Sequence, residues 1–190
     1  MTCLGILGST RGTVMHAVYS AIEQRKLPAT IGIVISNKPN AVILERAKTL
    51  QLPAQFIDPA GLTRDAYDQQ VTICLQQHHV DFIVLIGYMR ILSHDFVEKW
   101  HHKIINVHPS LLPLFAGKMD LDVHRAVLAA RSQETGCTVH YVTDDIDAGP
   151  ILLQKRCVVL KEDTPERLKE RVQALEGQAL VEALAQLCVS

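Results

Sequence analysis

The chain has 190 residues, which predicts one domain spanning residues 1–190, because a domain typically takes roughly 150 residues. Hydrophobic residues make up 48% and charged residues 21%, a balance that is typical of a folded globular protein and excludes a disordered one. The 19 basic and 20 acidic residues give a net charge of −1, so no broad positive field exists to bind nucleic acid or an anionic membrane. No apolar run is long enough to span a membrane and no signal peptide is evident, so we expect a cytoplasmic protein.

Short runs predict strands at residues 3–7, 30–35, 55–57, 82–86, 104–107, 137–142 and 151–159, and those at 30–35 and 82–86 have the apolar pattern of buried strands. Helical stripes lie between several of them, over residues 14–22, 43–50 and 67–78, and a last helix opens at Thr164-Pro165. Asn40 is expected to cap the second of these helices. The strands read as continuous apolar runs, which favours strands covered on both sides. The predicted fold is therefore α/β, an open, mostly parallel twisted sheet with helices on both faces.

Five scattered cysteines form no C-x-x-C pair. Isolated cysteines are typically small buried hydrophobic residues in a reducing compartment. A zinc site built from Cys and His needs closely spaced ligand pairs, and the sequence has none. We therefore expect no metal.

In open α/β sheets, ligands bind beyond the carboxyl ends of the strands, which selects three loops. The first, Gly8–Thr13, leads from a strand into a helix and suits a phosphate, although an ordinary glycine turn has the same pattern. The second, Gly87–Leu92, offers apolar side chains and one arginine that suit a flat ligand, and packing explains them equally well. The third loop starts at residue 106.

Asn106 and His108 lie two residues apart at a strand end, so both side chains leave the same face of the sheet. An amide and an imidazole placed together can stabilise an oxyanion, and the imidazole can transfer a proton. A nearby carboxylate would raise the pKa of His108 and keep it charged. Asp144, Asp145 and Asp147 supply three candidates, and their spacing does not decide among them.

The segment 106–113 (NVHPSLLP), followed by 144–150 (DDIDAGP), resembles the signature of the folate-dependent formyltransferase family. Segments 36–38, 87–92, 136–142 and 151–154 extend the resemblance in order over nearly the whole chain. The resemblance implies that 10-formyltetrahydrofolate, as co-substrate, donates its formyl group to the amine of 5′-phosphoribosylglycinamide. Small molecules would be the partners, and the protein would be a monomer or homodimer.

The resemblance also assigns site residues. The catalytic positions fall on Asn106, His108 and Asp147. Residues on the folate side are Arg64, Met89, Arg90, Ile91, Leu92, Asn106, Thr143, Asp144, Asp145, Ile146 and Asp147. Residues on the side of the ribonucleotide substrate are Gly12, Thr13, Val14, Pro109, Gln173 and Glu176.

Two departures from the family pattern concern the ribonucleotide. Thr13-Val14 stands where members usually carry Ser-Asn, and the stretch from Gly117 to His124 is longer than usual. Relatives that act on methionyl-tRNA, or that deformylate the folate, carry a further domain, and we expect 190 residues to accommodate none. A sugar-amine formyltransferase stays open as an alternative, as does a folate- or nucleotide-binding protein without turnover.

Overall fold

The computed structural model describes residues 1–188, in which seven strands form one sheet in the order β3-β2-β1-β4-β5-β6-β7. The strands are β1 (Thr2–Leu7), β2 (Ala29–Ser36), β3 (Ala54–Phe56), β4 (Phe82–Leu85), β5 (Ile104–His108), β6 (Glu134–Tyr141) and β7 (Ile151–Val158). The helices are α1 (Met15–Glu23), α2 (Val42–Thr49), α3 (Arg64–Gln77), α4 (His94–Lys99), α5 (Leu121–Ala129) and α6 (Pro165–Cys188).

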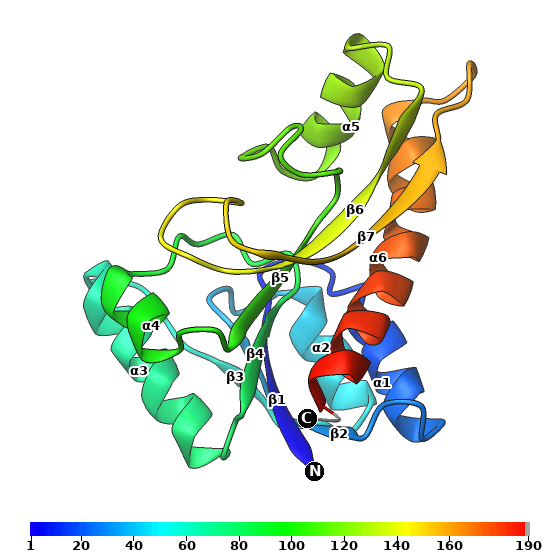
Figure 1. Cartoon of the computed structure of the whole chain (residues 1–190). Coiled ribbons are helices and arrows are strands. Elements are labelled where there is room, and N and C mark those ends of the chain that lie inside the picture. Colours follow the sequence, from blue (N-terminus) through cyan, green and yellow to red (C-terminus); the bar gives the residue numbers. More distant parts are fainter. Residues whose placement is uncertain (189–190) are drawn as a thin grey trace.

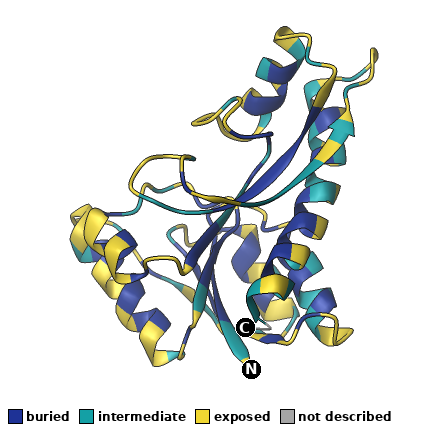
Figure 2. Ribbon diagram, in the orientation of Figure 1, coloured by how far each residue is buried: buried dark blue, intermediate teal, exposed yellow. Residues whose placement is uncertain are grey.

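Helices cover both faces of the sheet: α1, α2 and α6 pack on one side, and α3 and α4 pack on the other (Figure 1). Each face has its own buried cluster. Val18 of α1 and Leu180 of α6 belong to the first, and Tyr67 and Leu75 of α3 belong to the second. The buried residues accordingly run through the strands and along the inner sides of the helices (Figure 2).

The predicted fold class is confirmed. Strands β1 to β5 pair in parallel, whereas β6 and β7 run antiparallel to their neighbours, so the sheet is mostly parallel and open. The strand order reverses between β1 and β4, where ligands bind in such sheets. The pairing register brings together the ends of four strands, Leu7, Ile35, Leu85 and Asn106, so the loops that follow them share one edge of the sheet.

The expected Asn40 cap is wrong. Helix α2 begins after Ala41, which has no side-chain cap, because the carbonyl of Thr10 accepts the N–H of Ile43 at 3.1 Å instead. Two short helices, α4 and α5, were not among the predicted elements. Helix α4 is capped by the hydroxyl of Ser93. None of the helices within residues 1–188 is long and apolar enough to cross a membrane.

Candidate active site

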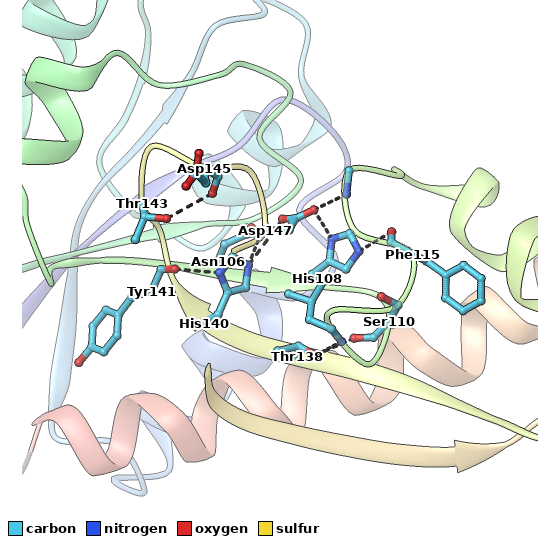
Figure 3. A network of polar contacts seen from close by, with 12 residues as sticks. Asn106, His108, Ser110, Phe115, Thr138, His140, Tyr141, Thr143, Asp145 and Asp147 are labelled. Atoms are coloured by element: carbon cyan, nitrogen blue, oxygen red, sulfur yellow. Dashed lines mark hydrogen bonds and ion pairs between the residues drawn. The ribbon is translucent and has the colours of Figure 1, made fainter. Parts of the chain in front are cut away.

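The three loops selected from the sequence lie at the carboxyl edge of the sheet, and β5 carries the central pair of side chains. Asn106 and His108 both belong to β5 and point to the same side of it, as predicted (Figure 3). The carboxylate of Asp147, from the loop between β6 and β7, meets the imidazole of His108, with Oδ2 lying 3.2 Å from Nδ1. Asp147 is therefore the one of the three candidate aspartates that reaches His108.

His108 is buried, and each of its ring nitrogens faces an oxygen. Nδ1 faces Asp147, and Nε2 lies 3.3 Å from the carbonyl oxygen of Phe115. Burial lowers the pKa of His108, although the Asp147 charge and the Phe115 carbonyl raise it. The net shift is opposite in direction to the one expected from a nearby carboxylate, because desolvation outweighs the ion pair with Asp147.

His140 is a residue of the site to which the sequence assigned no role. The register of β5 with β6 places it directly opposite Asn106. Its Nδ1–H donates to the carbonyl of Tyr141 at 2.8 Å, and its Nε2 accepts from the amide nitrogen of Asn106 at 3.2 Å. Burial lowers the pKa of His140, so the ring is neutral and fixes which end of the Asn106 amide faces the site. A histidine within the apolar strand 137–142 was the available signal.

Asp147 is held in an unusual backbone conformation with φ +55°. Its Oδ2 accepts the N–H of Gly117 at 2.8 Å, and its Oδ1 lies 3.7 Å from Nε2 of His140. The longer segment that starts at Gly117 is thus in direct contact with the catalytic candidate. Farther along this segment, Asp120 pairs with Lys169 of α6.

The rest of the loop between β6 and β7 is open to solvent. Thr143 is half-buried, and Asp144, Asp145 and Ile146 are exposed. The carboxylate of Asp144 lies 2.9 Å from Nδ1 of His94 on α4, and this contact raises the pKa of that histidine.

These two side chains and Glu98 form a group whose ligating atoms lie within 4.8 Å of one another. All three are exposed, as acidic groups without an ion commonly are. We therefore do not assign a metal-binding role to this group.

The loop between β4 and α4 offers apolar side chains. Met89 and Ile91 are 43% and 54% exposed, and Ile146 of the neighbouring loop is 57% exposed. Exposed apolar groups at the binding edge of the sheet suit a flat aromatic ring. Arg90 and Leu92 are half-buried, and Arg64 is exposed at the first position of α3.

The loop between β1 and α1 lies close to Ile43 of α2 at Gly12. This glycine has φ +62°, and an added Cβ would lie 2.3 Å from the Ile43 side chain. Thr13 is exposed, whereas Val14 is buried in the core beneath α1. The Val14 side chain therefore faces inward, and a ligand at the N-terminus of α1 would meet backbone N–H groups and not this side chain.

Helix α6 supplies Gln173 and Glu176 on one face, as their spacing predicts. Gln173 is half-buried, and Glu176 is buried. Burial raises the pKa of Glu176 to about 7, partly opposed by the charge of Lys169. The carboxyl is thus divided between protonated and ionised forms at neutral pH. Pro109, half-buried, directly follows His108.

Together these features define a site suited to group transfer at the edge of an α/β sheet. Similarity to known proteins identifies the family. Residues 4–184 match the model of the formyl transferase family, and the chain belongs to this family.

Among named relatives, the chain is 37% identical over 179 residues to the phosphoribosylglycinamide formyltransferase of Haemophilus influenzae, with 94% of this chain and 83% of that one aligned. It is 40% identical over 182 residues to the chicken (Gallus gallus) trifunctional purine biosynthetic protein adenosine-3, but spans only 18% of its length while 95% of this chain aligns.

A solved structure is also similar. The crystal structure of glycinamide ribonucleotide transformylase 1 from Symbiobacterium toebii superposes with a TM-score of 0.95 at 36% identity, covering 100% of this chain and 88% of that one.

Proposed function

We propose that this chain transfers the formyl group of 10-formyltetrahydrofolate to the amine of 5′-phosphoribosylglycinamide in purine biosynthesis. The observation that carries the proposal is the convergence of Asn106, His108 and Asp147 at the carboxyl edge of the sheet. The names of the relatives similar to this chain support the same substrates.

In the proposed reaction, the substrate amine attacks the formyl carbon directly. The formyl oxygen takes the place of the Phe115 carbonyl beside Nε2 of His108, and the free N–H of the Asn106 amide donates to the same oxygen. A negative charge developing there raises the pKa of His108, because the ring then lies between that charge and Asp147. His108 is then protonated on both ring nitrogens, so that Nδ1–H donates to Asp147 and Nε2–H donates to the formyl oxygen.

The proton released by the amine passes to the pair of Asp147 and His108, directly or through water. The bond between the formyl carbon and the folate nitrogen then breaks, while the new bond to the substrate amine is kept. The proton is transferred to the departing folate nitrogen. Each preorganised donor to the oxyanion is worth about 3 kcal/mol of the barrier. No step needs a metal or a covalent bond to the protein.

The two substrates are proposed to bind toward opposite faces of the sheet, the folate toward the face covered by α3 and α4 and the ribonucleotide toward the face covered by α1 and α6. The folate lies against Met89–Leu92, Thr143–Asp147 and Arg64, where exposed apolar side chains suit its ring. The phosphate of the ribonucleotide lies at Gly12–Val14 on the N-terminus of α1, and its ribose and amide lie near Pro109, Gln173 and Glu176.

The proposed partners are therefore small molecules, with no nucleic acid and no membrane, and the protein is proposed to be a monomer or homodimer. The proposed location is the cytoplasm, which the five free cysteines support because reducing compartments keep thiols unpaired.

The test mixes the purified protein with both substrates and follows the formylated product. Formylated glycinamide ribonucleotide supports the proposal. Formylation of a sugar amine in its place would identify the protein as a sugar-amine formyltransferase, and binding of both substrates without product would identify a binding protein.

A further inference from the structure

A buried polar cluster connects α3 to the segment proposed to bind the folate. Tyr67 and Asp68 come from α3, and Arg90 and Ser93 come from the loop between β4 and α4. Oδ2 of Asp68 accepts the backbone N–H of Ser93 at 2.6 Å. The Arg90 guanidinium lies 4.2 Å from the centre of the Tyr67 ring, at a distance typical of a cation–π contact.

These contacts fix both ends of a short stretch of backbone. At its start, the N–H of Met89 donates to the hydroxyl of Ser9 at 2.8 Å, and at its end Asp68 holds Ser93. Between them, Ile91 and Leu92 make no backbone hydrogen bond to other described residues of the chain. Their N–H and C=O groups are thus available to a ligand, while the segment that carries them is tied at both ends.

Asp68 is 2% exposed, and in the described part of the chain its Oδ1 and Nε of Arg90 lack hydrogen-bond partners. Burying such groups is expensive, and apolar side chains of similar volume would stabilise the fold at least as well. The buried carboxylate of Asp68 is therefore better explained by the backbone geometry that it imposes on Ser93 than by a contribution to the stability of the fold.

We propose that Asp68 is a positioning residue for the formyl donor, because it fixes the backbone of Met89–Leu92 against which the pteridine ring binds, and that Tyr67 supports it by packing against the Arg90 guanidinium. The inference rests on the proposed function, since the proposed function assigns this segment to the folate. Neither side chain needs to touch the ligand. Their effect passes through Ser93 and Arg90 and is confined to the folate side of the site.

Two variants at one position separate the hydrogen bond from the charge. Asp68→Asn keeps an oxygen that accepts from Ser93 but removes the charge near Arg90, whereas Asp68→Ala removes both. Asp65→Ala is the matched control, because Asp65 lies exposed on the first turn of the same helix. Binding of tetrahydrofolate is measured by titration calorimetry, alongside KM for each substrate and urea unfolding.

We expect Asp68→Ala to weaken tetrahydrofolate binding and raise KM for the formyl donor by tenfold or more. KM for the ribonucleotide should stay within twofold, and Asp68→Asn should fall in between. Wild-type affinity in a folded Asp68→Ala protein, or an equal rise of both KM values, overturns the inference. If Asp68→Ala does not fold, Asp68→Asn decides, with a selective rise for the donor supporting the inference and no rise overturning it.

Failure of the proposed function would look different. In that case the wild-type protein itself would bind no tetrahydrofolate or transfer no formyl group, whatever the residue at position 68.

Discussion

Asn106 and His140 face each other across β5 and β6, and the Asn106 amide nitrogen donates to Nε2 of His140 at 3.2 Å. Because Nδ1 of that histidine donates to the Tyr141 carbonyl, the ring has one lone pair to offer, and Asn106 occupies it. One amide hydrogen of Asn106 is thereby committed, and the other remains for a substrate oxygen. The orientation of a catalytic candidate thus depends on a histidine in the neighbouring strand.

Replacing His140 by Phe should therefore lower kcat by about tenfold to a hundredfold, because the Asn106 amide loses the acceptor that orients it, a loss of roughly 1.4–2.7 kcal/mol. Steady-state kinetics with both substrates measures this. His140→Gln, whose side chain can still accept from Asn106, should retain more activity than His140→Phe. Equal activity of the wild type and the Phe variant would contradict the assigned orientation.

Stability should fall in acid because three buried histidines, His108, His124 and His140, have a lowered pKa in the folded chain. The unfolded chain binds their protons near pH 6.5 and the folded chain does not, so the free energy of unfolding decreases as the pH falls below about 6.5. For His124, the shift from 6.5 to about 4 corresponds to roughly 3 kcal/mol.

Urea unfolding at pH 7.5, 6 and 5 measures this effect. His124→Gln should flatten the acid side of the profile. Parallel profiles for wild type and His124→Gln would show that this histidine does not titrate as assigned.

Glu176 should show the opposite dependence, because burial raises its pKa to about 7. The folded chain holds this proton between pH 4.5 and about 7 while the unfolded chain releases it, so the resulting stability is lost progressively as the pH rises from 4.5 to 7. Glu176→Gln removes that loss, so its stability relative to wild type should rise by up to about 1.4 kcal/mol per pH unit over this interval and level off above pH 7.

The same substitution should raise KM for the ribonucleotide, because a neutral amide is a weaker hydrogen-bond acceptor than the carboxylate proposed to lie near its ribose. Glu170→Gln, exposed on the same helix, is the control for both measurements. A stability difference that does not change with pH would count against the buried titration of Glu176.

Gly12→Ala should destabilise the chain by about 1–3 kcal/mol, since the new methyl group would overlap Ile43 and the backbone has a positive φ. Gly61 provides a matched control: its φ is +72°, and an added Cβ meets nothing within 4 Å. Thermal unfolding should show a clearly larger loss at Gly12 than at Gly61. Equal losses would mean that backbone strain, and not the contact with Ile43, limits this turn.

Much of the fold was predictable because its signals are local. Short runs rich in apolar residues located each of the strands, although the edge strands β3 and β7 contain no buried residue, and the spacing of Asn106 and His108 placed both side chains on one side of β5. Helix α4 is only six residues long, so its periodicity is too short to recognise.

The parts of the site that the sequence did not predict depend on contacts between distant segments. His140 acquires its place from the register of β5 with β6, which neither strand encodes alone. The pKa of His108 depends on how completely other elements bury it. The prediction considered only an aspartate partner, and therefore gave a raised pKa where the net shift is downward. The Thr10 carbonyl that replaces the Asn40 cap likewise comes from another loop.

The most direct test of the proposed catalytic pair is the rate of formyl transfer by Asp147→Asn, compared with Asp58→Asn. Asp147 contacts His108, whereas Asp58 is exposed in the loop after β3 and accepts the backbone N–H of Ala60. With saturating 10-formyltetrahydrofolate and 5′-phosphoribosylglycinamide, we predict that the wild type and Asp58→Asn turn over within about threefold of each other. Asp147→Asn should lose a hundredfold or more of kcat, about 2.7 kcal/mol. Turnover by Asp147→Asn at the wild-type rate, or no formylated product from the wild type, would contradict the account.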